Sequence, residues 1–258
     1  MPRFAANLTL LFTEVPMPER AAYAAQAGFD GIEVLFPYDM PVPDWERALA
    51  GLPLALINTP PGDWISGDRG FAARPGDEAV FRDGFLRAAD YATRLGGAQI
   101  HVMAGVAKGP QAEAAYVENL AWAAAQAPEL RLCIEPMNPE DMPGYFLNDY
   151  DQAGRILADL GCARVGLQFD LWHAARLHGD AAAVWARHEP VISHVQIAGF
   201  PARNEPGGGG FSLPALCDAV DALPAQPVWI SAEYRPARGT AQGLAWLTAL
   251  KSRGQPIG

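Results

Sequence analysis

The stretch EAVFRDGFLRAADYATRLGGAQIHVMAG, residues 78–105, contains the pattern that decides the fold. Residues 78–95 predict an amphipathic helix, because apolar residues recur there at three- and four-residue spacing. Those residues are Phe81, Phe85, Leu86 and Ala89. Gly96 follows as a helix C-cap, and residues 98–105 predict a short β-strand. A helix joined to a strand by a short glycine turn is one repeat of an alternating α/β fold.

The same alternation continues in both directions along the chain. The predicted strands cover residues 4–12, 31–36, 53–59, 98–105, 131–137, 164–170, 192–198 and 228–234. Helical patterns between them include residues 18–27, 78–95, 112–126, 150–160 and 213–223, with a final helix over 241–251. Eight such units in 258 residues predict an α/β protein with a (β/α)8 barrel, a TIM barrel, as a single domain over residues 1–258.

Composition excludes several other classes of protein. The turn after the first predicted strand, residues 13–16, has no GxGxxG pattern, which argues against a dinucleotide-binding sheet. A net charge of −10 argues against a nucleic-acid partner, and no apolar run approaches the ~18 residues that a membrane span needs. Cys133, Cys162 and Cys217 lack zinc-site spacing and predict a reducing, cytoplasmic compartment. The sequence leaves open whether the protein is a homo-oligomer.

Polar side chains end four consecutive predicted strands. Glu135 ends the fifth, Asp170 the sixth and Glu233 the eighth, while Gln196 lies near the end of the seventh. A TIM barrel builds its active site at this carboxyl rim. One carboxylate there is often only a helix N-cap, but three carboxylates on neighbouring strands would repel one another unless a cation bound them. All-oxygen ligation favours Mg²⁺ or Mn²⁺.

At these residues the chain resembles the hydroxypyruvate isomerase family, which belongs to the xylose-isomerase-like barrels together with ketose 3-epimerases and endonuclease-IV-type enzymes. The resemblance runs essentially end to end. It is carried by the segments AANLTLLF (5–12), GDW (62–64) with Gly70, IEPMN (134–138), QFD (168–170) with His173, HVQIA (194–198) and EYRP (233–236).

The resemblance implies that Glu135, Asp170, Gln196 and Glu233 bind a metal, and that Glu135 and Glu233 also form the acid–base pair. It also places His173 and Arg203 at substrate-binding positions of related epimerases. His101 lies in a His-Val-Met-Ala-Gly motif that some relatives share.

Three further interpretations concern a small anionic substrate. Its carboxylate needs a cation, for which Arg203 is the first candidate and Lys108 the second, although either could be a surface charge. Trp64 lies in a loop rich in glycine and proline that could cover the barrel mouth. One segment departs from the family, because Glu205 is followed by Pro and four glycines where the family carries an acidic Gly-Glu-Ile-Asn-Tyr segment.

The expected reaction interconverts hydroxypyruvate and tartronate semialdehyde by proton transfer through an enediolate. The nearest alternative is an isomerase or 3-epimerase of another small keto-acid or ketose, for example a 2-oxo-tetronate. A metal-cluster endonuclease is disfavoured by the five histidines and the acidic balance of the chain. A barrel that binds sugars or acids without catalysis is disfavoured by the intact Glu135 and Glu233.

Overall fold

The computed structural model describes residues 1–97, 99–224 and 227–253. The first residue of the predicted strand 98–105 and the last five of the predicted domain lie outside these ranges. Eight parallel strands pair in chain order, and β8 pairs with β1 to close a barrel. The strands are β1 (Arg3–Asn7), β2 (Gly31–Val34), β3 (Leu54–Asn58), β4 (Gln99–His101), β5 (Arg131–Ile134), β6 (Val165–Asp170), β7 (Ile192–Ile197) and β8 (Trp229–Ala232). The predicted TIM barrel is confirmed.

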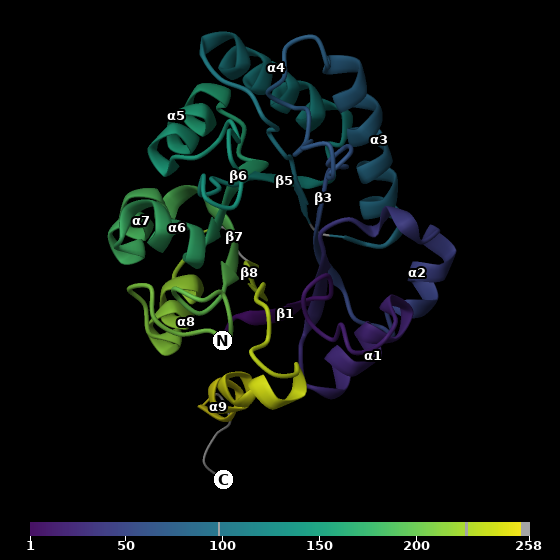
Figure 1. Cartoon of the computed structure of the whole chain (residues 1–258), viewed down its shortest axis with the longest axis vertical. Coiled ribbons are helices and arrows are strands. Elements are labelled where there is room, and N and C mark those ends of the chain that lie inside the picture. Colours follow the sequence, from purple (N-terminus) through teal and green to yellow (C-terminus); the bar gives the residue numbers. More distant parts are fainter. Residues whose placement is uncertain (98, 225–226, 254–258) are drawn as a thin grey trace.

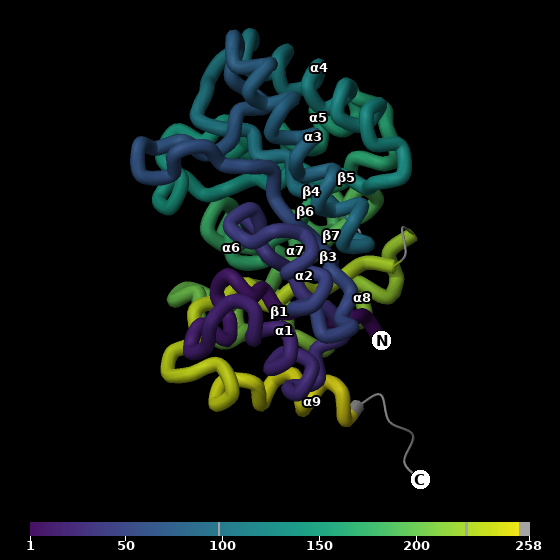
Figure 2. Tube along the Cα trace, turned by 90° about the vertical axis from the view of Figure 1, so that its right-hand side faces the viewer, coloured from purple at the N-terminus to yellow at the C-terminus, as the bar shows by residue number. Residues whose placement is uncertain are grey.

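Helices surround the strands on the outside of the barrel (Figure 1). They are α1 (Met17–Gln26), α2 (Val42–Ala48), α3 (Glu78–Arg94), α4 (Pro110–Gln126), α5 (Tyr150–Leu160), α6 (Leu171–His178), α7 (Ala181–His188), α8 (Leu213–Asp221) and α9 (Ala245–Arg253), with 3-10 turns η1 (Pro37–Asp39), η2 (Glu189–Val191) and η3 (Ala241–Gly243). The first and last units lie side by side in Figures 1 and 2, and Trp246 of α9 packs edge-on against Phe4 and Phe29.

Several elements differ from their predicted bounds. The first strand ends at Asn7 rather than at residue 12, because the Asn7 side chain accepts from the backbone of Thr9 and turns the chain. The predicted helix 241–251 is divided between η3 and α9. The helices α2, α6 and α7 were not predicted from the sequence; each has eight residues or fewer, too few turns to produce a clear apolar periodicity.

The inside of the barrel is polar over much of its depth. Near the amino ends of the strands, Trp229 packs with Ala5 and Ala55. A Cβ on Gly31 would lie 2.7 Å from the Trp229 ring, so only glycine admits this close approach. Above it lie buried polar groups: Asn7, Glu33, His101, Gln168, His194, Gln196 and Ser231. These groups support the carboxyl rim from below. Among the described residues, no helix has the length and apolar character needed to cross a membrane.

Candidate active site

The barrel brings together the four polar residues predicted at the strand ends. Glu135 and Glu233 directly follow β5 and β8, Asp170 ends β6, and Gln196 lies in β7. All four are buried. Gln168 links two of them, because its Nε2 donates to Glu135 Oε2 and to Gln196 Oε1, both at 2.8 Å. Gln196 in turn donates to Glu233. These three residues therefore form one hydrogen-bonded chain, which Asp170 joins through Arg203.

Burial and mutual repulsion disfavour the ionised forms of these carboxyls. Burial raises the pKa of Glu135 well above its usual value, and the charges of Glu233 and Asp170 raise it further. Burial raises the pKa of Asp170 to about 6, against the opposing effect of Arg203. The pKa of Glu233 is also raised well above its usual value, mainly by burial. Such a cluster is complementary to a cation, which would favour all three ionised forms.

In this structure, the guanidinium of Arg203 partly meets that demand. Its Nη2 lies 2.7 Å from Glu233 Oε1 and 3.5 Å from Asp170 Oδ2. Its Cζ also lies 4.6 Å from the centroid of the Trp172 ring. Arg203, the first candidate for a substrate carboxylate, is thus already paired with two carboxylates of the protein.

A second buried layer holds the rim from below. Glu33 accepts hydrogen bonds from Asn7 Nδ2, His194 Nε2 and Gln196 Nε2, each at 2.7 Å. Burial alone would raise the pKa of Glu33, but the hydrogen bond and charge of His194 outweigh it and leave the pKa below its usual value. Asn7 also donates to Glu233 Oε2 at 3.0 Å. This layer fixes the orientation of the Gln196 amide and of Glu233.

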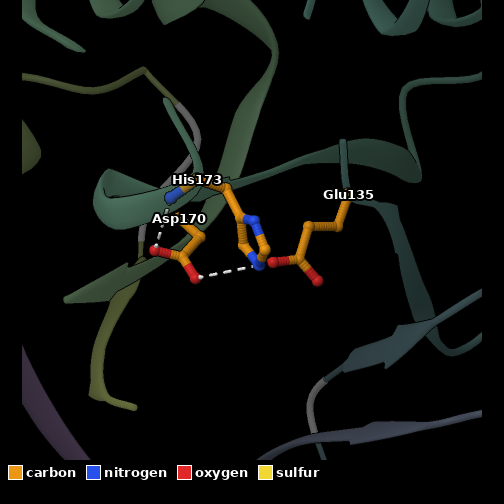
Figure 3. A group of neighbouring side chains, drawn as sticks. All are labelled: Glu135, Asp170 and His173. Atoms are coloured by element: carbon orange, nitrogen blue, oxygen red, sulfur yellow. Dashed lines mark hydrogen bonds and ion pairs between the residues drawn. The ribbon is translucent and has the colours of Figure 1, made fainter. Parts of the chain in front are cut away.

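Glu135, Asp170 and His173 form a buried group that could hold a metal ion, with one ligand atom of each within 4.8 Å of the others. In Figure 3 the His173 ring lies between the two carboxyl groups. The backbone N–H of Asn138 donates to His173 Nδ1 at 3.0 Å. Burial, followed by the charge of Arg203, lowers the pKa of His173 well below its usual value, so the ring is neutral.

A neutral imidazole whose Nδ1 accepts a hydrogen bond carries its proton on Nε2. The Nε2 atom of His173 lies 3.7 Å from Asp170 Oδ2. It therefore faces the site as a hydrogen-bond donor, and its protonation argues against metal ligation by this nitrogen. The geometry favours a substrate-orienting role for His173 over a place among the metal ligands.

A cavity of about 330 Å³ opens over this rim. Of the predicted site residues, Glu135, His173, Arg203, Glu233 and Trp64 line it. Trp64 is 42% exposed and packs against Phe36, with ring centroids 5.9 Å apart.

The remaining four predicted site residues are not among those that line this cavity: Asp170, Gln196, His101 and Lys108. His101 is fully buried in β4, with Nδ1 3.5 Å from Glu135 Oε2, and burial lowers its pKa to about 3. It therefore contacts the site from below as a neutral ring. Lys108 is exposed in the segment before α4 and is not among the cavity-lining residues.

Sequence reasoning missed other residues of the cavity. Asn58 ends β3, and its amide oxygen is buried without a hydrogen-bond partner among the described residues. Arg69 and Arg235 also line the cavity. Asn58 stood at the end of a predicted strand, the same signal that identified the carboxylates. Arg69 lies ten residues beyond the predicted strand 53–59, where strand position gives no signal.

Comparison with known proteins assigns the chain that carries this site to a family. A family model described as the xylose isomerase-like TIM barrel matches residues 21–250. The chain belongs to this family. It is 45% identical to the 2-oxo-tetronate isomerase of Cupriavidus necator, covering 96% of this chain and 98% of that one. It is 37% identical to the hydroxypyruvate isomerase of Escherichia coli K12, with the same coverage.

A solved structure described as an AP endonuclease of family 2 from Brucella melitensis superposes with a TM-score of 0.91 at 38% identity, covering 96% of this chain and 99% of that one. The relatives confirm the resemblance found in the sequence, and the chain is an isomerase of the hydroxypyruvate isomerase family acting on a sugar or keto-acid. Within the described residues, the metal-competent group contains one histidine, unlike the histidine-rich cluster expected of an endonuclease.

Proposed function

We propose that the protein interconverts a four-carbon 2-oxo-tetronate and its 3-oxo isomer. The observation that carries this choice is the 45% identity to a 2-oxo-tetronate isomerase over nearly the full length of both chains. The buried, unpartnered amide oxygen of Asn58 offers an acceptor at the cavity wall. A tetronate has a C4 hydroxyl that could donate to it, which a three-carbon acid lacks. The substrate expected first from the sequence, hydroxypyruvate, is therefore the second candidate, supported by the 37% identity to a hydroxypyruvate isomerase.

The donor set fits a hard divalent cation, Mg²⁺ or Mn²⁺. Glu135, Asp170 and Glu233 would hold it through carboxylate oxygens. Gln196 would add its amide oxygen, which accepts from Gln168 and retains a second lone pair. Two observations support this fit. The carboxyl pKa values are raised, and the Arg203 guanidinium already lies between Asp170 and Glu233 as a positively charged partner. When bound, such a cation would supply positive charge to the two reacting oxygens of the substrate.

The two glutamates divide the proton transfer between them. Arg203 donates directly to Glu233 and favours its ionised form, so Glu233 is the base that removes the C3 proton. Glu135 forms no ion pair with an arginine among the described residues and its pKa is raised by burial and by the neighbouring carboxylates, so it is assigned the return of a proton to C2. The Nε2–H of His173 orients a substrate oxygen. Trp64 at the mouth helps to exclude water.

The test is to follow 2-oxo-tetronate with the Mn²⁺-loaded protein by NMR in deuterated buffer. We expect the 3-oxo isomer to form and deuterium to appear at C2. Glu135→Gln and Glu233→Gln should each lower kcat by about 10²- to 10⁴-fold, the usual contribution of a positioned acid or base. Conversion of hydroxypyruvate with a clearly higher kcat/KM would give priority to the second candidate. Near wild-type turnover in either variant would contradict its role.

A further inference from the structure

Three arginines line the cavity, and their surroundings differ. Arg203 is already bonded to Glu233 and Asp170. Arg235 is exposed at the rim. Arg69 is half-buried in the loop after β3 and forms no ion pair with a carboxylate among the residues the structure describes. It is therefore a cavity-facing guanidinium whose charge the protein leaves unmatched.

The contacts of Arg69 hold it in one orientation. Its Nη1 donates to the carbonyls of Trp64 and Asp68, at 2.9 and 2.7 Å, and its Cζ lies 3.8 Å from the centroid of the Trp64 ring. The carboxylate of Asp68 does not compete for Arg69, because it pairs with Arg74 at 2.7 Å. No contact within the described residues uses Nε or Nη2 of Arg69. That edge is the one that can bind a carboxylate with two parallel hydrogen bonds.

The loop carrying Arg69 is fixed to the barrel. Gly70 forms a β-bridge with Ala104, and the next residues continue the contact, with Ala73 N donating to Ala104 O at 2.7 Å. A Cβ on Gly70 would lie 2.5 Å from Met103, which itself lines the cavity, and the φ of Gly70 is +100°. Only glycine permits this approach, which sets the neighbouring Arg69 against the cavity wall.

Arg69 and the carboxylate cluster follow different strands of the barrel. In the closed ring of eight strands, β3 lies opposite β7, while Glu135, Asp170 and Glu233 follow or end β5, β6 and β8. An acid substrate must keep its own carboxylate away from that cluster. We propose that Arg69, stacked on Trp64, binds the substrate's C1 carboxylate and makes the site selective for 2-oxo acids over neutral ketoses; this inference rests on the proposed function.

The experiment compares an acid with a neutral ligand of the same four-carbon skeleton. Calorimetry on the Mn²⁺-loaded protein measures binding of tetronate, the unreactive 2-hydroxy acid, and of erythrulose, the neutral ketose that has CH₂OH in place of the carboxylate of 2-oxo-tetronate. We expect Arg69→Gln to weaken tetronate binding by about tenfold to a hundredfold, the range for a charge-assisted hydrogen-bonded pair. Erythrulose binding should change less than about twofold. Arg69→Lys keeps the charge but loses the planar fork, so it should fall between.

Kinetics and two further variants complete the test. With 2-oxo-tetronate, Arg69→Gln should raise KM far more than it lowers kcat. Arg3→Gln is the matched control, because Arg3 stacks on Trp229 near the amino ends of the strands. This variant should leave the binding affinity of both ligands unchanged. Equal weakening of acid and neutral ligand by Arg69→Gln would overturn the proposal, as would an acid-selective loss in Arg235→Gln alone. Binding is read without turnover, so an inactive wild type would contradict the proposed function and leave this result decisive.

Discussion

Asp170 and His173 lie one helical turn apart, with Asp170 Oδ2 3.7 Å from His173 Nε2, yet their hydrogen bonds differ. Asp170 caps α6 by accepting from Trp172 N at 2.7 Å and from His173 N at 3.4 Å through Oδ1, which leaves Oδ2 for a cation. His173 uses Nδ1 to accept from the Asn138 backbone, so Nε2 keeps its proton. The two residues should therefore respond differently when a metal is titrated.

We expect Asp170→Asn to weaken Mn²⁺ binding by more than about 100-fold, beyond the 10- to 100-fold typical of outer hydrogen-bond partners. Asparagine still caps the helix, so the fold should persist. His173→Gln should stay within that outer range while lowering kcat/KM. Calorimetric Mn²⁺ titration measures both, with His188→Gln on α7 as the control. A loss in His173→Gln equal to that in Asp170→Asn would make His173 a ligand.

At the scale of elements, the sequence predicted the barrel because each long helix shows its apolar periodicity and each strand ends in a recognisable turn. It overestimated strand lengths where side chains end the ladder, as Asn7 does after β1. It placed Glu135, Asp170, Gln196 and Glu233 at one rim because neighbouring parallel strands end together. Nothing in a linear pattern could pair Glu33 with His194, since that contact joins residues 161 positions apart.

The first and last units of the barrel are joined by hydrogen bonds of Thr240, whose contribution to stability can be measured. Thr240, which is 1% exposed, accepts from Phe12 N at 2.7 Å and donates to Glu14 Oε2 at 3.2 Å, joining the loop after β1 to the segment after β8. Thr240→Val keeps the shape but leaves the Phe12 amide without its acceptor. We expect a loss of about 1–3 kcal/mol in the free energy of unfolding, measured by urea denaturation. Thr248→Val, exposed on α9, should change little; equal losses would contradict this account.

At one end of an otherwise well-packed barrel, three buried carboxyl groups repel one another when they are ionised. Its polar interior and the raised pKa values of the rim carboxyls come from one architecture, in which several strands deliver acids to a single buried layer. The carboxylate cluster was predictable from strand ends alone. Arg69 was not, because its place at the cavity depends on the contact of Gly70 with Met103, a tertiary feature.

The repulsion among these buried carboxyl groups predicts how metal binding and pH together affect the free energy of unfolding. The folded-state pKa of Asp170 is about 6, above its usual value of 3.8. Between these values the folded state keeps a proton that the unfolded state releases, so the free energy of unfolding falls as pH rises through this window. The loss is complete above the folded pKa, and the raised pKa values of Glu135 and Glu233 extend the same trend upward. A divalent cation binds the ionised carboxylates and offsets the loss, so its stabilising effect should grow with pH.

We therefore expect the difference in Tm between Mn²⁺-loaded and EDTA-treated protein to be larger at pH 8 than at pH 5 by several degrees. A change of 1 kcal/mol corresponds to about 2–4 °C in a protein of this size. Differential scanning calorimetry at both pH values measures it. The double variant Glu135→Gln/Glu233→Gln removes two of the three carboxyls and should reduce both the metal effect and its pH dependence. A wild-type difference that is equal at the two pH values would show that the rim carboxyls do not bind the cation in ionised form.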